Sequence, residues 1–219
     1  MYKCVIFDLD GTLIDTIKDL GVSCNYALSK NNCLTFEIED YYSFVGNGIK
    51  MLCKRALLKQ NIEDEILLEK VFNDFKDYYS LHYSDCSLPY KSIKEVINLL
   101  KKNNILIGVY SNKEVSLVNK IINKFFNIDD FVFVLGENIG YHRKPDPKQL
   151  LDNLNKYNLK LDDCIYVGDS EVDYLTAKNA NIRSIGVTWG FKNKDFLLNY
   201  QFDYLIDNPL EILKILSIK

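Results

Sequence analysis

The stretch CVIFDLDGT at residues 4–12 joins a short apolar run to two carboxylates that follow it at once. An apolar run of this kind is typical of a strand that is buried on both faces. One residue separates Asp8 from Asp10, and Gly11 and Thr12 come directly after them. A buried strand that ends in two carboxylates and a glycine predicts a functional site at the end of that strand.

Short apolar runs alternate with helical patterns over much of the chain. The expected strands are 3–7, 105–110, 131–135, 164–167, 183–188 and 202–206. The expected helices run from Ser92, capped with Glu95 in a capping box, from Lys113 to Lys124, after Pro147, from about Glu171 and from near Pro209. This alternation predicts an α/β fold with a Rossmann-like, mostly parallel sheet and helices on both faces.

Residues 16–85 interrupt the alternation because their apolar residues repeat at helical intervals only. Ile17, Leu20, Cys24 and Leu28 are an example of this spacing. The sequence therefore predicts an α/β core made of residues 1–15 and 86–219. A helical subdomain of residues 16–85 is expected to be inserted after the first strand.

Composition excludes several classes of partner and location. The net charge of −3 over 219 residues provides no basic surface for nucleic acid. No apolar stretch approaches the roughly 20 residues that span a bilayer, and no signal peptide is expected. Six cysteines are scattered without a CxxC pair, which indicates reduced thiols in a cytoplasmic protein. The oligomeric state, monomer or homodimer, stays open.

Polar side chains follow the expected strands. Asp8 and Asp10 follow the first strand, Ser111 and Asn112 follow the second, and Asp169 follows the fourth. In open α/β sheets, ligands bind beyond the carboxyl ends of the strands. We therefore expect these side chains to converge on one crevice, together with a lysine from the segment Arg143–Pro147.

Phosphoryl transfer through a carboxylate is the chemistry that suits these groups. Asp8 is expected to attack phosphorus and form an aspartyl-phosphate. Asp10 is expected to protonate the leaving group and later to activate water. A phosphate among carboxylates needs a cation, and Mg²⁺ prefers oxygen ligands such as those of Asp8, Asp169 and the backbone carbonyl of Asp10. Asp173, one helical turn after Asp169, is placed to orient a metal-bound water.

Other residues are expected to bind the phosphate group. Ser111 and Asn112, at the start of a helix, offer hydrogen-bond donors to phosphate oxygens. Lys144 offsets the negative charge of the nucleophile and the phosphate. Gly11 and Thr12, in one turn, are also expected to bind the substrate, and Gly11 lets the backbone approach the phosphate without a Cβ in the way.

The segments DLDGTLIDT, SNK, RKPDP and GDSEVD, in this order, resemble the four motifs of the haloacid dehalogenase superfamily. The resemblance implies that Asp8 is the nucleophile and Asp10 the general acid/base. It further implies that Ser111 and Lys144 bind phosphate, and that Asp169 with Asp173 holds Mg²⁺. The helical insertion resembles the C1 cap of the phosphoglycolate phosphatase-like branch. Its stretch FVGNGIKMLCKRAL (44–57) resembles the cap loop of that branch, and VTWGF (187–191) a loop late in its core.

The resemblance implies a Mg²⁺-dependent phosphatase for a small phosphorylated metabolite such as phosphoglycolate, with Gly46, Asn47 and Gly48 contacting the substrate. Lys54 and Arg55 are interpreted as surface charges, and Trp189 as a core residue. Asp10 argues against a dehalogenase or a phosphonatase, because both lack the second aspartate. A β-phosphoglucomutase-like phosphotransferase, a pyrophosphatase and a nucleotidase of the same superfamily stay open, as does a non-catalytic receiver-like binding module.

Overall fold

The computed structural model describes residues 2–218, which form two compact units. Of the described residues, the first unit contains 2–15 and 89–218, and the second contains Thr16–Leu88. The chain therefore leaves the first unit once and returns to it, so the second unit is an insertion. Two short strands, β2 (Ile14–Asp15) and β3 (Leu88–Pro89), pair where the chain passes between the units.

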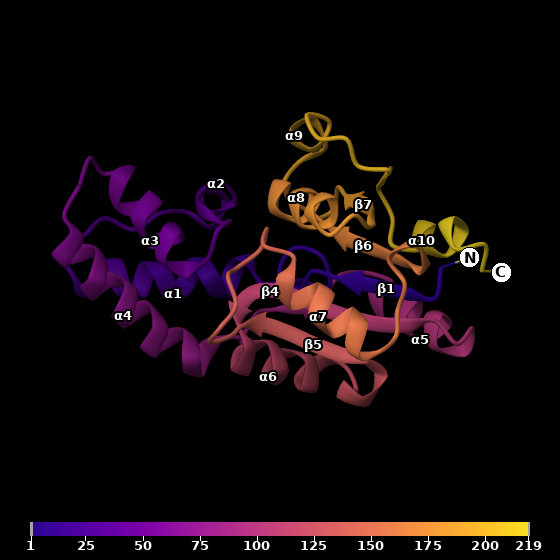
Figure 1. Cartoon of the computed structure of the whole chain (residues 1–219). Coiled ribbons are helices and arrows are strands. Elements are labelled where there is room, and N and C mark those ends of the chain that lie inside the picture. The colour runs from indigo at the N-terminus through magenta and orange to yellow at the C-terminus, as the bar shows by residue number, and fades with distance from the viewer. Residues whose placement is uncertain (1, 219) are drawn as a thin grey trace. The chain divides into compact units, whose positions relative to one another are not determined.

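The first unit is built on a six-stranded sheet (Figure 1). Its strands lie in the order β5-β4-β1-β6-β7-β8, and neighbouring strands are parallel. Their bounds are β1 Cys4–Phe7, β4 Leu106–Glu114, β5 Phe133–Glu137, β6 Cys164–Gly168, β7 Arg183–Val187 and β8 Tyr204–Ile206. The predicted parallel α/β sheet is confirmed.

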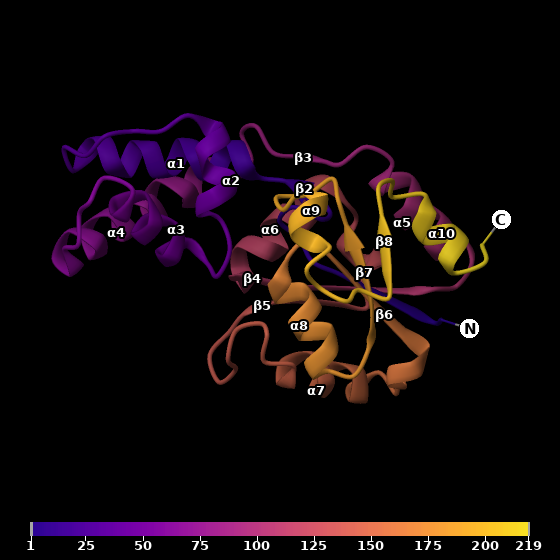
Figure 2. The same cartoon turned by 90° about the horizontal axis from the view of Figure 1, so that it is seen from above.

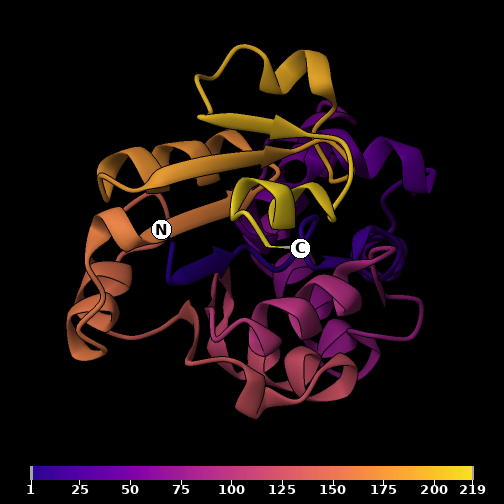
Figure 3. The same ribbon diagram turned by 90° about the vertical axis from the view of Figure 1, so that its right-hand side faces the viewer.

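Helices cover both faces of this sheet (Figures 2 and 3). One face carries α5 (Ile93–Lys102), α6 (Val115–Phe125) and α10 (Glu211–Ile215). The other carries α7 (Lys148–Lys156) and α8 (Glu171–Asn179), and the short α9 (Lys194–Leu197) lies between β7 and β8 in the chain. Helices switch faces because the chain builds the sheet outward from β1 in one direction and then in the other.

β1 lies at this switch point and positions the site. Its register places Phe7 beside Val109 of β4 and beside Val167 of β6. The residues that follow these three positions therefore emerge at the same edge of the sheet. Open α/β sheets bind their ligands at such a point.

β1 is held rigidly because it is the most enclosed strand of the sheet. Its four residues have no exposed surface. Burial of side chains such as Val5, Ile6 and Phe7 contributes roughly 1.5–3 kcal/mol each relative to exposure. The carboxylate that follows β1 is thus attached to a well-packed support.

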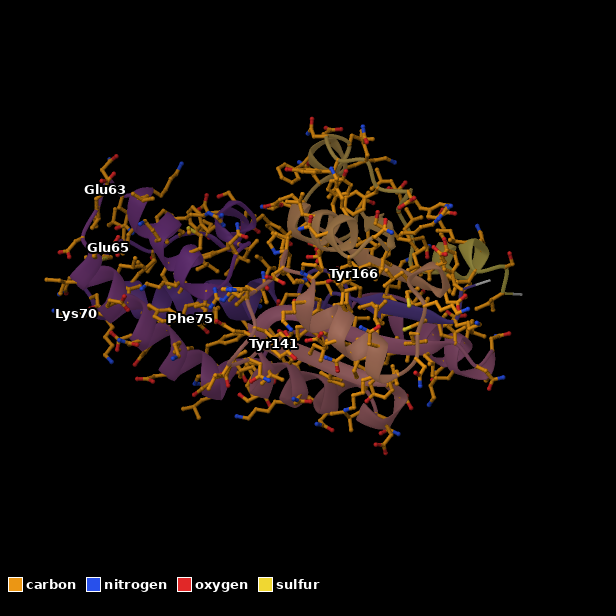
Figure 4. All side chains as sticks on the ribbon, in the orientation of Figure 1. Glu63, Glu65, Lys70, Phe75, Tyr141 and Tyr166 are labelled. Carbon is orange, nitrogen blue, oxygen red and sulfur yellow. The ribbon has the colours of Figure 1, made fainter. Side chains whose placement is uncertain are left out.

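The second unit is helical. Its helices are α1 (Ile17–Lys30), α2 (Tyr41–Phe44), α3 (Ile49–Leu58) and α4 (Glu65–His82), and α1 packs along α4. Phe75 of α4 is fully buried in this unit, whereas Glu63, Glu65 and Lys70 are exposed (Figure 4). Asp64 starts α4 by accepting hydrogen bonds from the backbone N–H groups of residues 66 and 67. Among the residues that the structure describes, no helix combines the length and the apolar character that a membrane span needs.

The second boundary of the helical unit differs from the expected one. It falls between Leu88 and Pro89 rather than after residue 85. The buried carboxylate of Asp19 in α1 accepts hydrogen bonds from the backbone N–H groups of Cys86 and Ser87. These bonds hold both residues to the helical unit, which extends it past the expected boundary.

One helix start and one helix cap also differ from the sequence prediction. β4 continues to Glu114, which pairs with Glu137 of β5 after a register shift, so α6 begins at Val115 and not at residue 113. The predicted capping box of Ser92 is wrong. Ser92 precedes α5 in a left-handed conformation with φ of 65°, and its side chain makes no capping hydrogen bond.

Candidate active site

The carboxyl edge of the sheet gathers the predicted residues of the core. Asp8 follows β1 directly, Asp169 follows β6 directly, and Ser111 lies in the last part of β4. The backbone N–H of Asp8 donates to the carbonyl of Val167 at 2.8 Å, which ties the ends of β1 and β6 together. All three side chains are buried, so the positions are fixed by strands rather than by mobile loops.

Lys144 reaches this edge from the connection between β5 and α7. Its Nζ lies 2.7 Å from Oδ1 of Asp8, 2.7 Å from Oδ1 of Asp173 and 3.1 Å from the hydroxyl of Tyr166. Its side chain is only 3% exposed. Burial alone would lower the pKa of Lys144, but the carboxylates of Asp173 and Asp8 raise it well above its usual value. Lys144 is therefore a fixed cation beside the predicted nucleophile.

Three buried carboxylates meet beside this one ammonium. Asp8, Asp169 and Asp173 each place an oxygen within 4.8 Å of the others. Burial raises the pKa of Asp8 well above its usual value, against the opposing effect of Lys144. Burial and then the charge of Asp173 raise the pKa of Asp169 to about 7. The three carboxyl groups outnumber the one ammonium, and such oxygen donors fit a divalent metal ion.

Asp169 is oriented by two donors. The hydroxyl of Thr12 donates to its Oδ1 at 3.0 Å, and the backbone N–H of Phe191 donates to its Oδ2 at 2.7 Å. The indole N–H of Trp189 donates to the carbonyl of Thr12 at 3.1 Å. Trp189 is thus a half-buried residue of the segment between β7 and α9 and not a core residue. Thr12, expected to bind substrate, instead directs its hydroxyl to Asp169.

Gly11 fills a position that a side chain could not occupy. Its φ is 85°, and a Cβ built there would lie 2.4 Å from Oδ2 of Asp169. The turn after Asp10 therefore comes into close contact with the carboxylate cluster. Residue 11 must therefore be a glycine to make room for the side chain of Asp169. The expected approach of a phosphate group would be a second reason.

Asp10 stands apart from the three clustered carboxylates. Its Oδ1 lies 2.7 Å from Nζ of Lys113, and the side chains are 19% and 4% exposed, respectively. Asp10 is thus the more accessible of the two partners. Lys113 was not among the expected site residues.

Asn112 is engaged with the backbone of Lys144. Its amide nitrogen donates to the carbonyl of Lys144 at 3.1 Å, and its amide oxygen accepts from the N–H of Lys144 at 2.7 Å. The expected helix start at Ser111 and Asn112 is wrong, because both residues lie in β4 and the residue before α6 is Glu114. The side chain of Asn112 therefore fixes the segment that carries Lys144.

The turn Gly46–Gly48 lies in the helical unit, between α2 and α3. All three of its residues have positive φ: 107° for Gly46, 62° for Asn47 and 86° for Gly48. The Nη1 of Arg55 donates to the carbonyls of residues 44, 45 and 46 at 2.8, 2.9 and 2.9 Å. Arg55 is therefore not the surface charge that the sequence suggested, since its guanidinium shapes this turn.

Comparison with known proteins assigns the family. A sequence model described as haloacid dehalogenase-like hydrolase matches residues 5–187, which is most of the chain. The chain belongs to the haloacid dehalogenase-like hydrolase family. The match begins within β1, contains the two carboxylates that follow this strand and continues to the end of β7. It therefore contains the three clustered carboxylates, Asp10 and Lys144.

Relatives of this hydrolase cover nearly its whole length. A phosphoglycolate phosphatase from Colwellia psychrerythraea is 31% identical over 96% of this chain and 95% of its own. One from Vibrio parahaemolyticus is 30% identical over 99% and 96%. A crystal structure from Lactobacillus delbrueckii subsp. bulgaricus has a TM-score of 0.93 at 29% identity and covers 98% of both chains. The predicted fold class and the predicted membership of a hydrolase family are confirmed.

Three contributors to the site were missed by sequence reasoning. Lys113 was assigned to a helix, Tyr166 was assigned to a strand without a role in the site, and Arg55 was assigned to the surface. Tyr166 is 1% exposed and lies inside the first unit, where its hydroxyl binds Lys144 (Figure 4). The available signal was the segment SNK, in which Lys113 lies two residues after the predicted phosphate-binding Ser111.

Proposed function

We propose that this hydrolase is a Mg²⁺-dependent phosphatase that acts on a small phosphorylated metabolite, phosphoglycolate or a close analogue, through an aspartyl-phosphate. One observation carries the proposal: Asp8, at the end of the central strand, lies within 2.7 Å of the buried ammonium of Lys144. An ion-paired carboxylate in a buried cationic setting is suited to attack phosphorus, because the cation offsets the charge of the incoming phosphate.

The first step transfers the phosphoryl group to Asp8. A carboxylate oxygen of Asp8 attacks phosphorus, the bond from phosphorus to the ester oxygen breaks, and that oxygen keeps the electron pair. Asp10 supplies the proton that the leaving oxygen needs. In the second step Asp10 removes a proton from water, the water oxygen attacks phosphorus, and Asp8 is released.

Mg²⁺ is the metal that we assign to the acidic cluster. Asp8 and Asp169 would hold it with carboxylate oxygens, and the backbone carbonyl of Asp10 would add a third ligand. A bound Mg²⁺ neutralises charge on the phosphate oxygens. Asp173 already accepts hydrogen bonds from Lys144, Tyr166 and Ser170. It would therefore hold Lys144 in place rather than bind the metal directly.

Ser111 and Lys144 are proposed to bind the transferred phosphoryl group, with Asn112 holding Lys144 in place. The backbone of Gly11 and Thr12 would face the same group. We further propose that the helical unit is a cap and that Gly46, Asn47 and Gly48 contact the remainder of the substrate. The names of the relatives support phosphoglycolate as this substrate, and the free thiols of the six cysteines support a cytoplasmic location.

Phosphate release from a panel of substrates tests the proposal. The panel contains phosphoglycolate, pyrophosphate, a nucleoside monophosphate and β-glucose 1-phosphate, each with Mg²⁺ and with a chelator. The expected result is Mg²⁺-dependent release that is highest for phosphoglycolate and is lost in Asp8→Asn. Isomerisation of glucose 1-phosphate without release would indicate a mutase. Stable phosphorylation without turnover would indicate a receiver-like module, and either result would overturn the proposal.

A further inference from the structure

We infer that Lys113 is a positioning residue for Asp10. Its ammonium holds the Asp10 carboxyl group where that group can deliver a proton to the leaving oxygen. The inference rests on the proposed function, since it assumes that Asp10 is the general acid. It assigns a role to the second buried lysine of the site, the last residue of the segment SNK, for which sequence reasoning had found none.

The placement of Lys113 follows from the strand that carries it. Successive side chains of a strand project to opposite faces. Ser111 and Lys113 are both buried, whereas Asn112 between them turns to the backbone of Lys144. The register of β4 against β5 shifts between Tyr110 and Glu114. Such irregularities redirect side chains at the ends of strands and are common beside active sites.

The pair with Asp10 explains why an ammonium is tolerated in this position. A buried charge is costly unless a partner compensates it. The side chain of Lys113 is 4% exposed, and its Nζ lies 2.7 Å from Oδ1 of Asp10. At this distance the contact is a charge-assisted hydrogen bond with a defined direction. The side chain of Asp10 is 19% exposed, so the ammonium of Lys113 holds it from the buried side.

The two buried lysines thus serve different carboxylates. Lys144 forms ion pairs with Asp8, the predicted nucleophile, and with Asp173, which belongs to the same carboxylate cluster. Lys113 contacts the carboxylate that is proposed to move protons. A misplacement of a catalytic group by about 1 Å can cost about 100-fold in rate, so a residue that fixes the acid affects the reaction without contacting the substrate.

Leaving groups of different basicity separate this role from a structural one. When the bond from phosphorus to the ester oxygen breaks, a benzyl alkoxide needs the proton from Asp10, whereas p-nitrophenolate is stable without it. We therefore compare kcat/KM for benzyl phosphate and p-nitrophenyl phosphate in the wild type and in Lys113→Met. This parameter covers steps up to the departure of the leaving group, so the later hydrolysis of the aspartyl-phosphate does not affect it.

The expected result is a loss of about 10- to 100-fold for benzyl phosphate and of less than about threefold for p-nitrophenyl phosphate. Lys148→Met, which removes an exposed lysine paired with Asp152, should change neither value. An equal loss with both substrates would overturn the inference, because it would indicate a general structural effect. A wild type that hydrolyses neither these esters nor any phosphate of the panel would instead refute the proposed function.

A double-mutant cycle tests the same inference when Lys113→Met alone does not fold. Asp10→Asn combined with Lys113→Met removes both charges of the pair. If Lys113 acts through Asp10, the second substitution changes kcat/KM for benzyl phosphate by less than about threefold in the Asp10→Asn background. A further loss of tenfold or more in that background, roughly that of an independent catalytic contribution, would contradict the inference.

Discussion

Substitution of Lys144 by methionine should destabilise the protein far more than removal of a surface lysine. Methionine keeps the length of the buried stem but removes the charge that faces Asp8 and Asp173, each 2.7 Å away. Breaking a buried ion pair by removing one partner costs about 3–5 kcal/mol, because the remaining charge is left without compensation. With a urea slope of about 3 kcal/mol per M, the unfolding midpoint should fall by about 1–1.7 M.

The loss should also depend on pH in a defined direction. Burial already raises the pKa of Asp8, and Lys144 opposes that rise. In Lys144→Met the folded-state pKa of Asp8 increases further above its unfolded value of about 3.9. A carboxyl group with a raised folded-state pKa contributes stability at low pH and loses it as the pH rises through that pKa. The variant should therefore be closest to the wild type near pH 5 and furthest from it near pH 8.

Urea unfolding in the presence of a chelator, at pH 5 and at pH 8, measures both effects. The matched control is Lys148→Met, whose lysine forms an ion pair of 2.9 Å with Asp152 but is 66% exposed. Exposed pairs within a helix contribute about 0.3–0.5 kcal/mol, so its midpoint should barely move. A Lys144→Met midpoint that stays within the range of this control at both pH values would refute the electrostatic description of the site.

Further perturbations should act on the metal, on Asp169 and on the helical unit. Mg²⁺ at 100 times its Kd should stabilise the protein by about 2.7 kcal/mol, which is a rise in Tm of about 5–11 °C, and no rise would argue against the metal site. In a chelator the Tm should fall between pH 5 and pH 8, because the pKa of Asp169 is raised to about 7, and Asp169→Asn should flatten this fall. Arg55→Met should cost about 1–3 kcal/mol in urea unfolding, because it leaves backbone carbonyls of the turn without their charged donor. The same variant should raise KM for phosphoglycolate more than it lowers kcat, and the reverse pattern would speak against a substrate-binding turn.

The fold and the carboxylates could be predicted because they depend on local patterns. A short apolar run that ends in a carboxylate forms a buried strand of a parallel sheet, and the carboxylate then lies at the carboxyl end of that strand. That arrangement is enough to place Asp8 and Asp169 at the same edge of the sheet. The roles of the residues at the end of β4 were harder to predict, because the sequence could not show that β4 continues past Tyr110 to Glu114. Lys113 was consequently assigned to a helix, and its contact with Asp10 was not foreseen.

Contacts with backbone atoms were beyond sequence reasoning. Arg55 binds carbonyl oxygens of the turn after α2, and Asp19 binds backbone N–H groups near residue 86. Every residue carries such backbone groups, so no residue pattern marks the partners. The role of Asn112 has the same cause, since its amide pairs with the backbone of Lys144 rather than with a recognisable side chain.

The most direct test of the central claim is to trap the phosphoryl group on Asp8. The enzyme is mixed with phosphoglycolate and Mg²⁺, quenched during turnover and treated with hydroxylamine, which converts an acyl phosphate to a hydroxamate. Peptide mass spectrometry then locates the modification. The expected result is a hydroxamate at Asp8 that is absent without substrate and absent in Asp8→Asn. Rapid turnover with no hydroxamate at Asp8, or with the modification on another carboxylate, would contradict the proposed mechanism.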